Sequence, residues 1–300
     1  MILSVVIPAY NEEGSIEASV RAIHTELVQN AIPHQILVVN DHSRDRTEEI
    51  LRALRAELPG VDYINNSGPN GFGNAVVAGL DNFSGDCVAV MMGDLSDSPA
   101  DLVRFYNKML EGYDCVFGSR FIKGGKTYDY PKIKLIINRM ANAIVQITLG
   151  LRYNDTTNAF KLYRRETIEG LKPFLAHHFN LTLELPLKAI VRGYSYAVVP
   201  NSWTNRKTGV SKLRIREMGS RYFFILLYCL IEKFFSRGDY LKKHTSTPPA
   251  GASQHAAPQP PATPPADLST RRQQPPADSS AALFGANQEK LLSQHTPGQG

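Results

Sequence analysis

Three aspartates stand where they could bind a cation or a charged ligand. Asp94 and Asp97 lie three residues apart in a polar segment that follows an apolar run, and Asp41 follows another such run. A carboxylate at the end of a buried strand needs a partner or a cation to stay charged. Carboxylates at short spacing suit Mg²⁺ or Mn²⁺ that also contacts substrate phosphates. Asp94 and Asp97 are therefore candidate ligands of a metal ion. Asp97 could equally cap a helix that begins at Pro99.

Basic residues in two loops could neutralise a diphosphate. Arg120 follows a Gly-Ser pair, and Arg206 and Lys212 lie on either side of Gly209. A flexible basic loop can close over a diphosphate, where its cations stabilise the leaving group. A solvated surface turn is the alternative interpretation of the same loop.

The elements that must position these residues form a repeating pattern. Residues 2–7 and 35–39 are continuous apolar runs, and residues 12–30 between them carry apolar side chains at helical spacing. Such a β-α-β unit requires a parallel sheet. The pattern repeats with helices at 46–58, 73–82 and 99–110 and strands at 61–64, 87–92 and 115–118.

The predicted fold is therefore an open, mostly parallel α/β sheet with helices on both faces. In such a sheet, ligands bind outside the carboxyl ends of the strands. We expect residues 8–12, Asp41 and Asp94 to meet in one crevice. Residues 124–126 (GGK) indicate a flexible loop, which is a candidate lid for that crevice.

Residues 132–149 and 216–235 predict two helices that are rich in apolar side chains and flanked by basic ones. A helix of this kind either packs into the core or lies on a membrane surface. We favour the core for residues 132–149. For residues 216–235 we favour the membrane surface, because so much apolar surface stands at the end of the folded part. The most apolar run, residues 222–231, falls well short of the ~20 residues that cross a bilayer, so we expect no transmembrane helix.

The composition divides the 300-residue chain near Thr245. Ten of the nineteen prolines lie between Thr245 and Gly300, and such a segment cannot bury enough apolar surface to offset its ordering entropy. We predict a folded domain at residues 1–215, an amphipathic membrane-surface region at 216–244 and a disordered tail at 245–300. The tail has no net charge, so the +5 of the chain belongs to the folded part. This charge suits a phosphate-bearing ligand or an anionic membrane.

The cysteines indicate the compartment. Cys87, Cys115 and Cys229 are widely spaced and form no Cys-x-x-Cys pair, which argues against a disulfide framework or a zinc site and fits a reducing cytoplasm. The N-terminus lacks the charged start and the cleavage site of a secretory signal. We expect a cytoplasmic protein with no nucleic-acid partner.

Six ordered segments resemble family-2 glycosyltransferases, and most closely their dolichol-phosphate mannosyltransferase-like branch. They are residues 5–13 (VVIPAYNEE), 39–47 (VNDHSRDRT), 70–75 (NGFGNA), 118–121 (GSRF), 155–165 (DTTNAFKLYRR) and the pair Arg206 and Lys212. Each segment is weak alone, but together they are specific for the family. The resemblance implies a GT-A-like fold with the catalytic domain in residues 1–215.

The resemblance also implies roles for single residues. The acceptor phosphate would be held by Arg120 and Arg139. The residues with an implied catalytic role are Asp94, Arg120, Arg206 and Lys212. The implied nucleotide-sugar site comprises Pro8, Tyr10, Glu12, Val39, Asp41, Gly93, Asp94, Arg120, Arg206 and Lys212, with Asp41 on the base.

One segment departs from the family. Where the family has Asp-x-Asp, this chain has Met92-Gly93-Asp94, so the first carboxylate of the metal site is missing. Metal binding would then depend on Asp94, together with Ser96 or Asp97.

The implied reaction is the transfer of a sugar, with inversion, from GDP-mannose or a UDP-sugar to a polyprenyl phosphate. The acceptor is already an anionic phosphate, so no strong general base is needed. Mg²⁺ or Mn²⁺, Arg206 and Lys212 would stabilise the departing diphosphate. The expected partners are the nucleotide-sugar, the polyprenyl phosphate and a membrane surface, with the protein peripheral on the cytoplasmic face.

Two other functions are compatible with the same residues. A family-2 transferase with a saccharide acceptor would need a general base, for which Asp97 and Glu184 are the candidates. Glu184 could instead pair with Lys188. A catalytically silent nucleotide-sugar binding protein would suit the incomplete metal motif.

Overall fold

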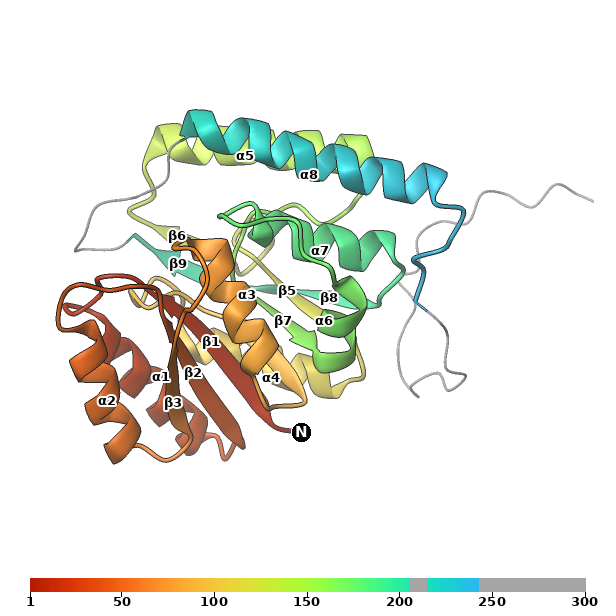
Figure 1. The fold of residues 1–300 in the computed structure, drawn as a ribbon. Coiled ribbons are helices and arrows are strands. Elements are labelled where there is room, and N and C mark those ends of the chain that lie inside the picture. The colour runs from red at the N-terminus through yellow and green to blue at the C-terminus, as the bar shows by residue number, and fades with distance from the viewer. Residues whose placement is uncertain (206–214, 243–300) are drawn as a thin grey trace, which may run out of the picture. The chain divides into compact units, whose positions relative to one another are not determined.

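The computed structural model describes residues 1–205 and 215–242. A seven-stranded sheet with strand order β3-β2-β1-β4-β7-β5-β8 runs through this part of the chain (Figure 1). Neighbouring strands are parallel except at β7, which runs antiparallel to both β4 and β5. The strands are β1 (Leu3–Ala9), β2 (His34–Asn40), β3 (Val61–Asn65), β4 (Cys87–Val90), β5 (Cys115–Ser119), β7 (Lys161–Arg164) and β8 (Tyr196–Pro200).

Helices cover both faces of the sheet, each over its own apolar core. Apolar side chains at three- and four-residue spacing face the sheet, as in α1, where Ile16, Val20, Ile23 and Leu27 are buried. One face carries α1 (Ile16–Gln29), α2 (Thr47–Glu57) and α4 (Pro99–Leu110). The other carries α3 (Phe72–Asn82), α6 (Arg165–Leu171) and α7 (Leu181–Val191). The expected open, mostly parallel sheet with helices on both faces is confirmed.

The candidate lid leads into a regular strand. β6 (Lys126–Tyr128) pairs in parallel with β9 (Ser202–Thr204) in a second, two-stranded sheet. The backbone N–H of Gly125 also donates to the carbonyl of Ile122 at 2.9 Å. Backbone pairing therefore holds this segment, where the sequence indicated only a flexible loop.

Two long helices, α5 (Lys132–Leu149) and α8 (Ile215–Phe235), lie side by side beyond α7 (Figure 1). The Arg192 guanidinium, at the end of α7, donates to both carboxylate oxygens of Glu232 at 2.7 and 2.9 Å, and both side chains are buried. Lys233 Nζ donates to the carbonyl of Leu149, at the end of α5, at 2.6 Å. These contacts make α8 part of the same compact unit as the sheet.

The outer sides of α5 and α8 expose large apolar side chains, which we call the α5–α8 face. Ile147 is 83% exposed and Phe235 is 77% exposed. The other members are Ile133, Ile136, Met140, Phe224, Leu227, Ile231 and Phe234. Within residues 1–205 and 215–242, no helix is long and apolar enough to span a membrane.

The expectation that residues 132–149 pack into the core is wrong for most of the apolar side chains of that helix. α5 carries apolar residues around most of its circumference, and the buried positions are Asn142, Val145 and Leu149. The side chains that dominate the sequence pattern therefore point away from the core.

Candidate active site

A cavity of about 1190 Å³ lies at the carboxyl ends of the parallel strands. Its wall combines residues that follow β1, β2, β4 and β5 with residues from α5 and α8. The structure brings Pro8, Tyr10, Glu12, Asp41 and Asp94 together in this wall, as the strand order requires. The same cavity therefore connects the edge of the sheet with the space beneath the two long helices.

Two residues implied for nucleotide-sugar binding are not among those that line the cavity. Val39 is buried inside β2. Gly93 lies against α1, where a side chain would come within 3.1 Å of Ile16, so glycine allows the segment after β4 to approach that helix. Arg206 and Lys212 lie outside the described residues.

The segment after β4 folds back on itself within the cavity wall. The backbone N–H of Ser96 donates to Asp94 Oδ1 at 3.1 Å, and Leu95 has a φ of 57°, which is rare for leucine. The buried Asp97 carboxylate lies near the backbone of Met92, whose N–H favours the charged form of the carboxylate. Burial, together with the charge of Asp94, raises the pKa of Asp97 to about 7. Two carboxylates thus lie close enough in the wall to interact.

Arg120 enters the cavity from the end of β5 as the partner of Asp155. Its Nε and Nη2 donate to the two carboxylate oxygens at 2.8 and 2.7 Å, and its backbone N–H donates to Oδ2 at 3.0 Å. Burial alone would lower the pKa of Arg120, but the charge of Asp155 outweighs it and raises that pKa. The rings of Phe121 and Tyr130 lie 5.2 and 5.7 Å from the guanidinium. Arg120 is therefore a fixed cation in the wall.

The Asp41 carboxylate, expected at the base of the donor, already accepts three hydrogen bonds from the loop after β3. Asn66 Nδ2 donates to Oδ1 at 2.7 Å, while Asn70 Nδ2 and the backbone N–H of Gly71 donate to Oδ2 at 3.1 and 2.8 Å. Asp41 thereby holds Asn70 and Gly71 at the cavity wall, which all three residues line.

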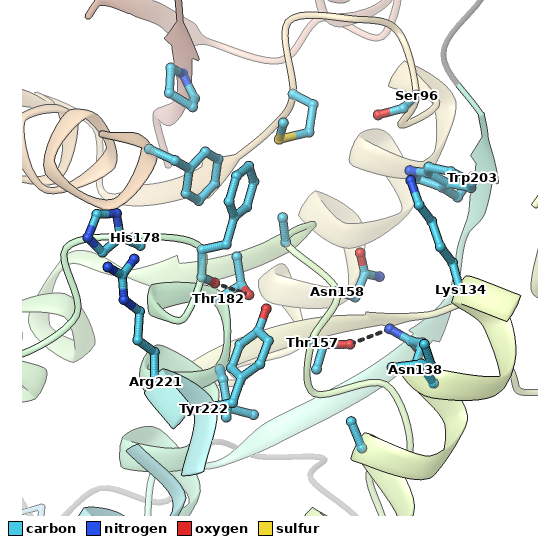
Figure 2. Close-up of a pocket in the computed structure, with 18 of the residues that line it drawn as sticks. Ser96, Lys134, Asn138, Thr157, Asn158, His178, Thr182, Trp203, Arg221 and Tyr222 are labelled. Atoms are coloured by element: carbon cyan, nitrogen blue, oxygen red, sulfur yellow. Dashed lines mark hydrogen bonds between the residues drawn. The ribbon is translucent and has the colours of Figure 1, made fainter. Parts of the chain in front are cut away.

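At the helical end of the cavity, the basic side chains in the wall are those of Lys134 and Arg221, whereas Arg139 was the one implied by the resemblance. Arg139 does not line the cavity; its guanidinium lies 4.5 Å from the Phe121 ring, and Nη1 donates to the carbonyl of Asn154 at 3.3 Å. Lys134 of α5 and Arg221 of α8 do line it, and Figure 2 shows their side chains on opposite sides of the view. Lys134 and Arg139 are five residues apart in one helix and therefore point to different sides.

Several lining side chains were missed because no sequence pattern marks them. Trp203, the single tryptophan of the chain, lines the cavity from β9, and its ring centroid lies 4.8 Å from that of Tyr130. Asn138 Nδ2 donates to Thr157 Oγ1 at 2.7 Å, which joins α5 to the segment before β7 (Figure 2). A lone aromatic in a three-residue strand and a neutral amide carry no periodic signal.

The end of the cavity beneath the two long helices is apolar. Its wall there comes from α5, α7, α8 and Phe179, which lies two residues before α7 and stacks on Phe72. The apolar lining residues are Ile137, Ala141, Ile144, Val145, Phe179, Leu183, Phe223 and Leu226. The cavity is thus acidic and polar at the sheet and apolar at the helices.

Glu184 is not among the residues that line the cavity. It is fully buried and accepts the backbone N–H groups of Leu175 and Ala176 at 2.8 and 2.7 Å. Lys188 Nζ lies 2.5 Å from its carboxylate. Of the two interpretations of Glu184, the ion pair is the one that the structure shows.

Comparison with known proteins identifies the class. Residues 4–171 match the model of glycosyl transferase family 2. Polyprenol monophosphomannose synthase of Mycolicibacterium smegmatis is 32% identical over 216 residues, which cover 70% of this chain and 80% of the relative. Dolichol-phosphate mannosyltransferase of Pyrococcus furiosus is 33% identical over 219 residues, which cover 71% of this chain and 60% of the relative.

Solved structures support the same fold. Glucosyl-3-phosphoglycerate synthase from Mycobacterium tuberculosis, in complex with Mn²⁺, uridine diphosphate and phosphoglyceric acid, superposes with a TM-score of 0.58 at 22% identity. The match covers 76% of this chain and 78% of that one. The same synthase with Mg²⁺ and uridine diphosphate gives a TM-score of 0.56 at 21% identity, over 77% and 78% of the two chains.

The chain belongs to glycosyl transferase family 2, because the family model covers more than half of its length. It is a glycosyltransferase, similar to the polyprenol monophosphomannose synthase and the dolichol-phosphate mannosyltransferase described above. The resemblance inferred from the six segments and the GT-A-like fold are both confirmed.

Proposed function

We propose that this glycosyltransferase moves a sugar, with inversion, from GDP-mannose or a UDP-sugar to a polyprenyl phosphate. The observation that carries the proposal is the two-ended cavity, which is polar at the sheet and apolar between α5 and α8. The polar end suits a nucleotide-sugar, and the apolar end suits the first units of a lipid chain. The names of the two mannose-transferring relatives support the same substrates.

The acceptor phosphate needs no strong general base, because its oxygen is already anionic. That oxygen attacks the anomeric carbon while the bond from this carbon to the nucleoside diphosphate breaks on the opposite side, which inverts the centre. We assign the acceptor phosphate to Arg120 and Lys134 in preference to Arg139, which contacts Phe121 outside the cavity. The leaving diphosphate is assigned to the segment that contains Arg206 and Lys212.

The acidic turn fits a hard divalent cation. Asp94, Ser96 and Asp97 offer oxygen donors, and Asp97 Oδ2 is buried with no hydrogen-bond partner among the described residues. Mg²⁺ or Mn²⁺ bound there would neutralise charge on the diphosphate. Among the described residues, no three His, Cys, Asp or Glu side chains are grouped so that they could hold a metal ion by themselves. The remaining ligands are therefore assigned to water and to the phosphates of the donor.

The α5–α8 face supports a peripheral position on a membrane. Burying its exposed apolar side chains in the interfacial region would bring the apolar end of the cavity next to the lipid chain of the acceptor. The basic residues Lys233 and Arg237, at the end of α8, would favour anionic lipids. Cys87, Cys115 and Cys229 are buried free thiols, which suits the cytoplasmic face.

The test is nucleotide release from a panel of GDP- and UDP-sugars with Mg²⁺ or Mn²⁺, with and without polyprenyl phosphate in detergent. We expect release that depends on the lipid phosphate and that Asp94→Ala abolishes. Asp129→Asn removes an exposed carboxylate at a positive-φ position that asparagine tolerates, and it is the matched control. Release that requires a saccharide acceptor, or no release with any lipid phosphate, would overturn the proposal.

A further inference from the structure

Asp97 has an unusual place among the buried carboxylates. Within residues 1–205 and 215–242, three buried side-chain atoms have no hydrogen-bond partner: Asp97 Oδ2, Tyr163 OH and Asn180 Oδ1. Asp97 Oδ2 is the single carboxylate oxygen in this group. Leaving a buried ionised oxygen without a partner costs more than leaving a neutral polar atom. The cavity wall therefore contains a buried carboxylate oxygen with an unmet need for a positive partner.

The fold of the turn directs this carboxylate toward residue 92. The chain reverses at Leu95, whose φ is 57°, and the Asp97 carboxylate then lies near the backbone N–H of Met92, which favours its charged form. Residue 92 is the position at which a first carboxylate of an Asp-x-Asp motif would stand, and here it carries a thioether. A thioether is a soft ligand and a poor partner for Mg²⁺ or Mn²⁺. Asp97 thus supplies an oxygen beside the position that lacks one.

A left-handed leucine is a strained conformation that persists only where the surroundings impose it. Leu95 is also 42% exposed, so burial of its side chain does not explain the strain. Two further contacts fix the turn: the N–H of Ser96 donates to Asp94, and the N–H of Thr204 donates to the carbonyl of Ser96 at 2.9 Å. The strained backbone at Leu95 lies between Asp94 and Asp97, and both of these residues line the cavity.

We propose that Asp97 replaces the missing carboxylate of residue 92, so that the cation of this glycosyltransferase is held by Asp94 and Asp97. This inference deepens the proposed function, because it names the ligand pair of that site. One cation between the two side chains would pair Asp97 Oδ2 and remove the repulsion between the carboxylates. Replacing only one of the two carboxylates would leave an incomplete pair.

The test measures Mn²⁺ binding itself rather than turnover. Free Mn²⁺ is followed by electron paramagnetic resonance, with the full chain, in saturating GDP and then in saturating UDP. We expect Asp97→Asn to weaken Mn²⁺ binding at least about tenfold, the size typical of damage to a metal site. The double variant Met92→Asp with Asp97→Asn returns a carboxylate to position 92 and should recover most of the loss. Asp129→Asn is the control and should bind as the wild type does.

The outcomes separate this inference from the proposed function. Unchanged Mn²⁺ affinity in Asp97→Asn would overturn it, as would wild-type protein that binds no Mn²⁺ with either diphosphate. Failure of the double variant to recover binding while Asp97→Asn stays folded, judged by thermal melting, would overturn the replacement of residue 92. Loss of lipid-dependent nucleotide release with intact, Asp97-dependent Mn²⁺ binding would reject the proposed acceptor and leave the ligand pair standing.

Discussion

Arg120 and Asp155 form a paired contact in which two guanidinium nitrogens meet two carboxylate oxygens at 2.7 and 2.8 Å. The pair joins the end of β5 to the segment before β7, and both side chains are buried. A cation that lines the cavity is therefore held in place by a carboxylate from another part of the chain. The two residues are far apart in the sequence, and the fold brings them into contact.

Asp155→Asn should destabilise the protein strongly, because it leaves the Arg120 guanidinium buried without its countercharge. Removing one partner of a buried ion pair costs about 3–5 kcal/mol, which urea denaturation followed by circular dichroism would measure. Glu57→Gln, which breaks the exposed contact of Glu57 with Arg21, is the control and should leave the midpoint nearly unchanged. Equal midpoints for both variants would contradict the assigned role of the buried pair.

The main fold could be predicted because its strands are continuous apolar runs and its helices have apolar residues at helical spacing. β7 escaped prediction because it is short and begins with Lys161, a charged residue. In the structure that side chain is fully buried, and Nζ donates to the carbonyls of Thr156 and Thr182 at 3.1 Å each. α7 escaped because Pro186 lies inside it. In both segments tertiary contacts override the local pattern.

The cavity residues near the strand ends could be predicted for the same reason, since strand ends follow from the apolar runs. The residues of α5 could not. Lys134 and Arg139 are both basic residues of one amphipathic helix, and only the packing of α5 decides which of them faces the cavity. The exposed apolar residues of α5 hide the helix orientation, because apolar side chains on a helix normally indicate its buried side.

Lys134→Ala should impair use of the acceptor more than Arg139→Ala does. A hydrogen bond to a charged group contributes about 1.5–3 kcal/mol, which corresponds to a loss of about tenfold to hundredfold in kcat/KM for the lipid phosphate. Arg139→Ala leaves the cavity lining unchanged and is the matched control on the same helix. Steady-state kinetics with varied lipid at saturating donor make the comparison. A larger loss in Arg139→Ala would reverse the assignment.

Charges on the α5–α8 face should remove membrane binding without affecting the fold. Ile147→Glu combined with Phe235→Glu places two carboxylates among exposed apolar side chains. Burying one such side chain is worth about 1.5–3 kcal/mol, so we expect vesicle partitioning to fall more than about tenfold. Co-sedimentation with vesicles of phosphatidylcholine and phosphatidylglycerol measures this. Val28→Glu, on the far helix α1 and also exposed, should bind vesicles as the wild type does.

Trp203 should report occupancy of the cavity. It is the single tryptophan of the chain, and its ring lies in the cavity wall against Tyr130. A nucleotide-sugar bound nearby would exclude water from the ring, so titration with GDP-mannose or UDP-glucose should change the emission in a saturable way. Trp203→Phe removes the only tryptophan and therefore the emission itself. Free mannose is the control ligand and should leave the emission of the wild type unchanged. Emission that stays constant while calorimetry detects binding would place the nucleotide elsewhere.

Acid should loosen the attachment of α8. Burial disfavours the charged form of Glu232, but Arg192 outweighs it and lowers the pKa of Glu232 below its ordinary value of 4.5. A lowered folded-state pKa gives stability that is present above the unfolded pKa and is lost as the pH falls through the folded pKa. Between about pH 5 and about pH 3, the free energy of unfolding should therefore fall more steeply for wild type than for Glu232→Gln. Parallel curves of unfolding free energy against pH for the two proteins would count against this role of Glu232.

The antiparallel strand β7 has a consequence for the order in which the sheet is completed. β4 pairs with β7 and so does β5, so these two strands are joined only through residues 161–164. A chain synthesised as far as residue 160 would leave β4 with one unpaired backbone edge and β5 with two, because β8 also follows β7 in the chain. Such edges recruit other strands. β4 and β5 can therefore be joined only after β7 has been made, some seventy residues after β4 begins. Such a long-range pairing slows folding.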